Sequence, residues 1–252
     1  MNMAVTDALA ALPGHSLDDQ LAVELMNRVD TKFLVPEAVL ETCLGQLADH
    51  YSVLELSGER RLPYDTLYFD TPERRFYRDH HNGKLNRYKI RLRHYRHSGA
   101  TFLEVKKKTN RLRTLKTRIP VQPGQTELPD LANFLQRCSG QPVARMRPAL
   151  FVHYRRATLV NAGGTERITL DTRLSFASAD HGQTLALPGY AIVEVKAGHH
   201  RETSLFRDHL QRMGCRPVSF SKYCIGSSLL YGHSLKTNRF QPLLRSLYGI
   251  CY

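Results

Sequence analysis

The sequence lacks the features that identify a membrane or secreted protein. No run of eighteen or more apolar residues occurs in the 252-residue chain, and the N-terminal segment MNMAVTDALAALPGH has no basic region of a secretory signal. The five cysteines are widely spaced and include no CxxC pair, which favours buried free thiols in a reducing compartment. These absences predict a soluble, cytoplasmic protein without a membrane span.

Several catalytic motifs are also missing. The phosphate-cradling sequence GxxxxGK[ST] does not occur, which argues against a P-loop enzyme. No HExxH or GxSxG is present, and the 12 histidines show no recognisable zinc spacing. Any catalytic site must therefore be built from other residues.

Acidic residues are scarce where basic residues are concentrated. The chain has 36 Lys and Arg against 23 Asp and Glu, a net charge of +13. Between Lys84 and Arg118 the sequence contains thirteen basic residues and a single acid, Glu104. Because the excess is local, it indicates a binding site for an anionic partner rather than general solubility.

The pattern of helices and strands predicts an α+β fold dominated by an antiparallel sheet. Helices are expected over residues 36–50, 128–137 and 204–213, and a final amphipathic helix in SKYCIGSSLLYG. The strand-like runs are TLYFDT, NRYKIRLRHY, TFLEVKKK, LRTLKTRIPV, ALFVHYRRATLV, RITLDTRLSF and AIVEVKA. With no repeat and no linker-like segment, the chain is expected to form one domain over residues 28–235, with a lead-in at 1–27 and a C-terminal tail at 236–252.

Alternation within the strands separates charged from apolar side chains. In YKIRLRHY, Lys89, Arg91 and Arg93 share one face, and Ile90 and Leu92 share the other. The charged faces of the other strands carry Glu104, Lys106, Lys116, Tyr154, Arg156, Arg167, Asp171, Glu194 and Lys196. A solvated sheet face alternates too, but cations concentrated on neighbouring strands repel each other unless an anion lies in front of them. A closed β-barrel would place these faces in a lumen and the apolar faces against helices.

The carboxylates among the cations indicate which kind of anion binds. A nucleic-acid groove rarely contains carboxylates, since they repel phosphate. Tyr88 and Tyr95 are expected to pack in the wall of the barrel rather than to stack on bases. Carboxylates beside Lys and Arg suit a triphosphate site in which hard oxygen ligands hold Mg²⁺ or Mn²⁺. Glu104, Asp171 and Glu194 are therefore candidate metal ligands, and no sequence-specific nucleic-acid binding is expected.

The ordered set of strand motifs resembles a known family. RVDTKFLV, YFDT, KIRLRHY, LEVKKK, LKTRIPV, HYRRAT, RITLDTRL, VEVKA and SFSKYCIG follow one another as in the catalytic domain of the vacuolar transporter chaperone (VTC) family, within the triphosphate tunnel superfamily. The resemblance covers most of the chain. It implies an antiparallel β-barrel tunnel that binds ATP and polyphosphate or triphosphate with a divalent metal.

In the VTC branch the resemblance implies transfer of the ATP γ-phosphoryl group to a growing polyphosphate chain. It implies a main metal ligand in Glu194, with Lys196 beside it, and a terminal helix that brings Ser221 and Lys222 to the tunnel mouth. The implied phosphate-binding residues are Lys32, Arg91, Arg93, Lys106, Lys116, Arg156 and Arg167. The alternation of side chains along the strands adds Lys89 and Tyr154 as substrate-binding candidates.

Two departures from the superfamily pattern narrow the expected activity. The ExExK motif of the hydrolase and cyclase branches is replaced here by RVDTK, which disfavours those activities, and Ser219 stands where eukaryotic VTC sequences have a basic residue. Hydrolysis of a triphosphate in the same tunnel and non-catalytic binding of polyphosphate or nucleic acid remain the alternatives. A role in export would need a separate membrane partner.

Overall fold

The computed structural model describes residues 4–22, 28–111, 113–122, 129–140, 143–180, 182–198 and 204–248. The chain divides into two compact units, each assembled from separated segments. The first unit contains residues 1–62, 154–174 and 187–220, and the second contains residues 63–153, 175–186 and 221–252. The predicted boundaries at residues 27 and 235 stay predictions.

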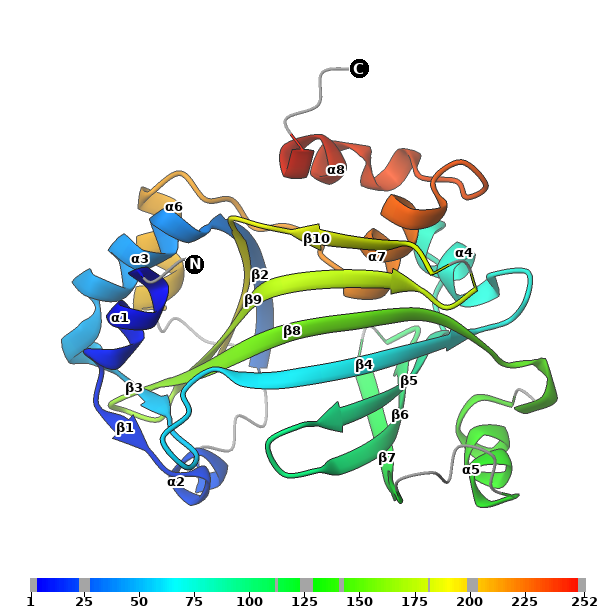
Figure 1. Cartoon of the computed structure of the whole chain (residues 1–252), viewed down its shortest axis with the longest axis horizontal. Coiled ribbons are helices and arrows are strands. Elements are labelled where there is room, and N and C mark those ends of the chain that lie inside the picture. Colours follow the sequence, from blue (N-terminus) through cyan, green and yellow to red (C-terminus); the bar gives the residue numbers. More distant parts are fainter. Residues whose placement is uncertain are drawn as a thin grey trace. The chain divides into compact units, whose positions relative to one another are not determined.

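The first unit is a sheet covered by helices on one face. Its strand order is β2 (Arg28–Pro36), β11 (Tyr190–Gly198), β9 (Glu166–Ser178) and β8 (Arg147–Asn161), followed by β3 (Tyr51–Leu54) and β1 (Gly14–His15). The helices are α1 (Ala4–Ala10), α2 (Leu17–Ala22), α3 (Glu37–Gln46) and α6 (Leu205–Arg212), and α1, α3 and α6 lie together (Figure 1). A short 3₁₀ turn, Ala48–His50, joins α3 to β3.

The core of the first unit forms where the apolar face of each strand meets these helices. Phe33, Val35, Val193 and Phe206 are fully buried in it. The same core includes Val5, Leu9 and Leu12 from the first residues of the chain, so helix α1 packs against this unit. The helix predicted over residues 36–50 and the one predicted over 204–213 are confirmed as α3 and α6.

The second unit is built on a meander of consecutive antiparallel strands. Its order begins with residues 147–153 of β8, the part of that strand in this unit, and continues with β4 (Leu62–Asp70), β5 (Arg87–Tyr95), β6 (Ala100–Lys108) and β7 (Thr114–Val121); β10 (Thr184–Leu187) pairs with β9. Its helices are α4 (Arg75–His81), α5 (Pro129–Ser139), α7 (Lys222–Tyr231) and α8 (Gln241–Tyr248), with 3₁₀ turns at Val143–Arg145 and Asn238–Phe240. The sequence predicts neither β10 nor α8.

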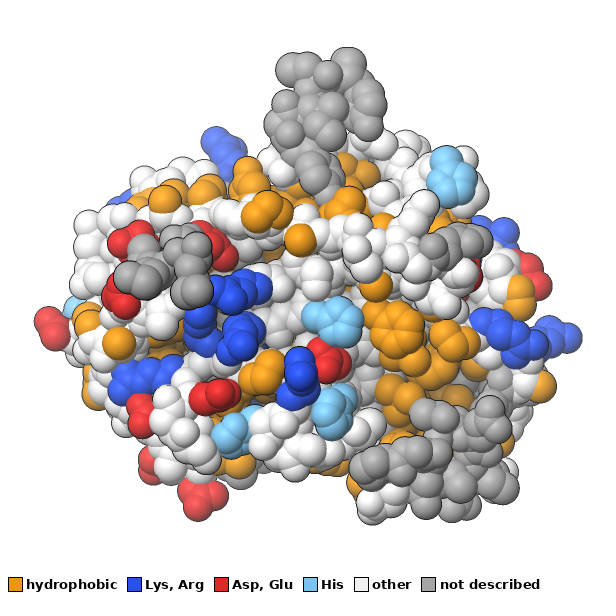
Figure 2. All heavy atoms as spheres, in the orientation of Figure 1, with side chains coloured by type: hydrophobic (Ala, Val, Ile, Leu, Met, Phe, Trp, Pro, Cys, Tyr) orange, Lys and Arg blue, Asp and Glu red, His pale blue; other side chains and the backbone are white. Residues whose placement is uncertain are grey.

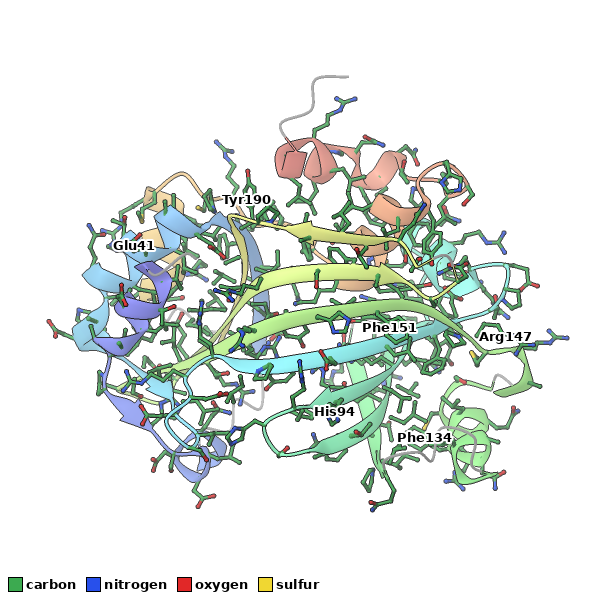
Figure 3. All side chains as sticks on the ribbon, in the orientation of Figure 1. Glu41, His94, Phe134, Arg147, Phe151 and Tyr190 are labelled. Carbon is green, nitrogen blue, oxygen red and sulfur yellow. The ribbon has the colours of Figure 1, made fainter. Side chains whose placement is uncertain are left out.

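The apolar face of the meander packs as the alternation predicts. Ile90, Leu92, Leu103 and Val105 are buried in one cluster with side chains of α5, including Phe134, which is marked in Figure 3. Because side chains alternate along a strand, burying this face directs the charged residues of β5 and β6 to the other side. The α+β class and the antiparallel sheet are thus confirmed. The path of paired strands begins at β2 and ends at β7, so among the described residues the sheet is open rather than closed.

Helix α7 differs from its sequence prediction. The segment SKYCIGSSLLYG was expected to be amphipathic, but eight residues of α7 are buried, on nearly all sides. Small residues make this burial feasible: a Cβ atom at Gly226 would collide with the ring of Phe176 and the side chain of Leu150. The prediction of an amphipathic helix is therefore wrong, because α7 packs inside the second unit instead of on its surface. No described helix is long and apolar enough to cross a bilayer.

Candidate functional site

The charged residues of the second unit form rows across the meander. In the antiparallel register, Lys106 lies directly opposite Lys89 on β5 and Lys116 on β7. The next row joins Tyr68, Arg91, Glu104 and Arg118, and the one after it joins Thr66, Arg93, Phe102 and Pro120. We call this side of β4–β7 the basic face. Like charges directly opposite each other destabilise a sheet, and in this row the Lys116 ammonium group is paired with the Glu104 carboxylate.

Glu104 holds the cations of the basic face in position. Its carboxylate is fully buried, and Arg91 contacts Oε2 through Nε at 2.7 Å and Nη2 at 2.6 Å. Lys116 Nζ lies 2.5 Å from Oε1, and Arg93 Nη1 lies 4.0 Å from Oε2. Burial would raise the pKa of Glu104, but these three cations outweigh it and keep that pKa well below its ordinary value. One anion therefore orders three cations and leaves a net positive charge.

Two buried polar groups of the basic face are unsatisfied. Arg93 Nε and Thr66 Oγ1 have no hydrogen-bond partner among the described residues, although Arg93 is only 7% exposed and Thr66 2%. The two residues are direct neighbours in the β4–β5 register. An unpaired buried donor is costly, so the Arg93 Nε and Thr66 Oγ1 atoms mark an unusual position in this sheet.

Helix α7 adds a further cation to this face. Tyr68 is buried, and its hydroxyl accepts a hydrogen bond of 3.2 Å from Arg91 Nη1. Burial raises the pKa of Tyr68, but the positive charges of Arg91, Arg93 and Lys222 outweigh it and lower that pKa. Lys222 is the first residue of α7, and Ser221 is its N-cap, whose hydroxyl accepts from the Cys224 N–H at 3.3 Å.

A second group of charges lies in the first unit, centred on Glu194. Its Oε1 lies 2.8 Å from Lys32 Nζ, and its Oε2 lies 2.6 Å from Lys196 Nζ. Burial would raise the pKa of Glu194, but Lys196 and Lys32 outweigh it and hold the pKa well below its usual range. The pKa of Lys196 is lowered, mainly because the ammonium group is buried. The register explains the contact, because Glu194 lies directly opposite Lys32 on β2.

Arg156 and Asp171 extend this group. Nε and Nη2 of Arg156 hold the two oxygens of Asp171 at 2.6 and 2.8 Å, a bidentate pair. The guanidinium group also lies over the ring of Tyr154, 5.3 Å from its centre. Arg167 lies opposite Lys196 in the β9–β11 register. We call these residues, with the Glu194 ion pairs, the Glu194 cluster.

Three carboxylates, Glu104, Asp171 and Glu194, are the candidates for holding a divalent metal. Mg²⁺ is commonly held by one or two carboxylates together with substrate phosphates. Both oxygens of Asp171 are occupied by Arg156, and Glu104 is occupied by three cations. The described residues contain no group of three or more His, Cys, Asp or Glu suited to a metal. Both oxygens of Glu194 are also in contact with cations, Lys32 and Lys196, but the buried Thr169 hydroxyl opposite it has no described partner, so Glu194 is the carboxylate with a further unpaired oxygen beside it.

The structure distributes the predicted site residues between the two units. The basic face and α7 bring together Lys89, Arg91, Arg93, Glu104, Lys106, Lys116, Ser221 and Lys222. The Glu194 cluster brings together Lys32, Tyr154, Arg156, Arg167, Asp171, Glu194 and Lys196. Their roles in catalysis or metal binding stay predictions. On the face of the molecule that Figure 2 shows, Lys and Arg side chains lie beside Asp and Glu side chains.

Three polar residues of these groups were missed by sequence reasoning. Thr66 and Tyr68 lie on β4, and Thr169 lies on β9 between Arg167 and Asp171. The signal for the first two was present in TLYFDT, where Thr66 and Tyr68 alternate with apolar Leu67 and Phe69. It was overlooked because neither residue carries a charge.

Comparison with known proteins identifies the family. A model of the VTC domain matches residues 27–231. The chain belongs to the VTC domain family. Both groups of charges lie inside the matched range, since Lys32 and Lys222 are their outermost predicted members. No curated protein sequence matches the chain.

Solved structures show the fold of this VTC domain. A proposed adenylate cyclase from Bacillus halodurans is 13% identical with a TM-score of 0.51, and the match covers 77% of this chain and 94% of that one. A proposed adenylyl cyclase from Hippeastrum, described as having a dominant triphosphatase activity, is 14% identical with a TM-score of 0.52, over 81% and 96% of the two chains. At this identity the likeness shows the fold alone, which is the triphosphate tunnel fold that the sequence motifs imply.

Proposed function

We propose that this VTC domain is a polyphosphate polymerase that transfers the γ-phosphoryl group of ATP to the end of a polyphosphate chain. The observation that carries the proposal is the row of Lys89, Lys106 and Lys116, next to buried Arg93 and Thr66 with unsatisfied polar atoms. A run of phosphates would provide acceptors for the ammonium groups of this row and for those atoms at once. The Glu194 cluster supports the same chemistry, because it combines phosphate-binding cations with one candidate metal ligand.

Phosphoryl transfer at such a site needs positioning and charge stabilisation more than acid–base chemistry. An oxygen of the terminal phosphate attacks the γ-phosphorus, and the bond from that phosphorus to the β–γ bridging oxygen breaks. ADP leaves with the electron pair. The attacking oxygen is already ionised at neutral pH, so no general base is needed. Arg91, Arg93 and Lys222 would stabilise the charge that develops on the transferring group and on the departing phosphate.

Glu194 would hold a divalent metal, and such an ion would supply Lewis-acid neutralisation of phosphate charge. Lys32 and Lys196 already contact both oxygens of that carboxylate. With substrate present, the two ammonium groups could turn to phosphate oxygens while the carboxylate serves the cation. Glu104 and Asp171 would instead keep their arginines in place, although both were predicted as metal ligands.

The deciding experiment is incubation of the purified protein with ATP and Mn²⁺, followed by gel analysis of chain length and by assays for ADP and free phosphate. Polymerase activity produces long chains with one ADP for each phosphate added. Free phosphate without chains would identify a triphosphate hydrolase and overturn the proposal. Salt-dependent binding without turnover would identify a binding module.

A further inference from the structure

One end of the basic face is aromatic. Tyr64 and Tyr95 lie opposite each other in the β4–β5 register, with ring centres 5.0 Å apart. Phe102 on β6 meets Tyr95 edge to face at 5.8 Å. All three rings are half-buried. They lie on the side of the sheet that carries Arg91 and Arg93. Tyr95 follows Arg93 by two positions on β5, Tyr64 is the cross-strand partner of Tyr95, and Phe102 is the cross-strand partner of Arg93.

Guanidinium groups lie over two of these rings. The Arg118 guanidinium carbon lies 4.6 Å from the centre of Phe102, and that of Arg93 lies 5.6 Å from the centre of Tyr64. Aromatic and guanidinium planes at such distances attract each other and can stack on a flat conjugated ligand. The apolar core of this unit lies on the opposite face of the same strands, so core packing does not account for an aromatic cluster here.

The chemistry of the basic face changes in one direction along the strands. From the aromatic end, β5 presents Tyr95, Arg93, Arg91 and then Lys89. At about 3.3 Å per residue, the six steps from Tyr95 to Lys89 span about 20 Å. This is long enough for an extended nucleoside triphosphate. Stacking groups suit a base, and the arginines and lysines suit phosphates.

We propose that Tyr64, Tyr95 and Phe102 form the base-binding subsite of a nucleoside triphosphate whose phosphates run along Arg93 and Arg91 toward the lysine row. The inference rests on the proposed function only in taking a nucleoside triphosphate as the donor. It fixes the direction of the substrate, with the γ-phosphate toward Lys89. It also revises the expectation that Tyr95 only packs in the wall; His94, the adjacent residue on β5 (Figure 3), faces the other way and hydrogen-bonds to Thr101.

Calorimetry with two matched ligands tests the subsite. The ligands are the β,γ-methylene analogues of ATP and of ribose 5′-triphosphate, which differ only in the base. The wild type should bind the ATP analogue about five- to hundredfold more tightly, the range expected for stacking of one base on an aromatic ring. Tyr95→Leu and Phe102→Leu should remove most of this difference and leave the ribose analogue unchanged.

Two variants control for indirect effects. Tyr95→Phe keeps the ring and should keep the preference for the base. Tyr88→Leu removes a half-buried tyrosine from the opposite face of the same strand and should leave both affinities unchanged. Circular dichroism establishes that each variant is folded. An equal loss for both ligands in Tyr95→Leu, or a wild type without preference for the base, overturns the inference.

Photolabelling of the wild type gives an answer that does not depend on any variant. Irradiated 8-azido-ATP should label peptides that contain Tyr64, Tyr95 or Phe102, and unlabelled ATP should compete. Labelling confined to other peptides overturns the subsite. Neither measurement requires turnover, so a protein that makes no polyphosphate but prefers the base would refute the proposed polymerase and retain this inference. Chain synthesis without a preference for the base would support the proposed polymerase and refute this inference.

Discussion

Arg91 and Glu104 face each other across the β5–β6 pair with both side chains almost completely buried. The Arg91 side chain is 10% exposed and the Glu104 side chain 0%, and Nη2 lies 2.6 Å from Oε2. Desolvating two charges is expensive, and the pair is stable only because each ion compensates the other. Glu104 also serves Arg93 and Lys116, so one buried carboxylate determines the geometry of much of the basic face.

Replacing this carboxylate should therefore destabilise the fold. Glu104→Gln leaves two buried guanidinium groups without a counter-ion, and we expect the free energy of unfolding to fall by about 3–5 kcal/mol. Urea unfolding at pH 7 measures the change. Asp65→Asn, which removes a partly exposed ion pair with Arg96 in the same unit, should cost at most about 1 kcal/mol. Equal losses in the two variants would contradict the role given to Glu104.

The same substitution predicts a pH dependence. The folded pKa of Glu104 is lowered below the ordinary glutamate value of 4.5, so its contribution to stability is present above about pH 4.5 and is lost as the pH falls through the folded pKa. The difference in unfolding free energy between wild type and Glu104→Gln should be constant from pH 7 to 5 and shrink in stronger acid. A difference that grows as the pH falls would show that the pKa is raised instead.

Neighbouring lysines on β6 offer a matched test of the basic face. Lys106 lies in the three-lysine row, whereas Lys107 points to the other face, where its Nζ lies 5.4 Å from the centre of the Tyr88 ring. Lys106→Ala should lower chain synthesis about tenfold or more, because it removes a charge that stabilises the phosphates. Lys107→Ala should change synthesis less than twofold. Initial rates of ADP release at saturating Mn²⁺ measure both.

Lys106→Ala should affect function more than stability. Without ligand Lys106 lies opposite two other lysines, and we expect the substitution to change the free energy of unfolding of the apo protein by less than about 1 kcal/mol. Added polyphosphate should then raise the melting temperature of the wild type more than that of the variant. A strongly destabilised apo variant would show that Lys106 has a structural role instead.

Two carboxylates of the first unit should respond differently to metal. Glu194→Gln should raise the Mn²⁺ concentration needed for half-maximal activity by about tenfold or more, since a metal-ligand oxygen loses its charge. Asp171→Asn should lower the maximal rate, because Arg156 loses the carboxylate that holds its guanidinium group in place. The Mn²⁺ requirement should stay nearly unchanged. Metal titration of both variants makes the comparison. A shifted requirement in Asp171→Asn alone would reverse the assignment.

Tyr223 should anchor α7 to the second unit. Its hydroxyl donates to Asp70 Oδ2 at 2.5 Å, and its ring stacks on Tyr68 with centres 5.2 Å apart. Tyr223→Phe keeps the ring but leaves the buried Asp70 with one donor fewer, which should cost about 1–3 kcal/mol. Tyr88→Phe, at a half-buried ring, should cost less than about 0.5 kcal/mol. Thermal and urea unfolding measure both, and equal effects would contradict the anchor.

How far the sequence could predict this protein is clear from β5 and α7. The alternation in YKIRLRHY correctly assigned Arg91 to one face and Ile90 to the other, because side-chain direction in a strand has a period of two residues. The burial of α7 could not be predicted in the same way. Whether a helix is covered on every side depends on segments distant in sequence, here Phe176 and Leu150, and no local pattern encodes them.

The sequence by itself determined the class of the fold, the family, and the face on which each charged residue lies, since these depend on local periodicity and motif order. Only the tertiary structure decided which residues face each other. Register across strands placed Lys89, Lys106 and Lys116 in one row, paired Arg156 with Asp171, and left Arg93 and Thr66 with unsatisfied polar atoms. Pairing between strands is set by turns and by burial of the whole sheet, so the neighbours of a charge are a property of the folded chain.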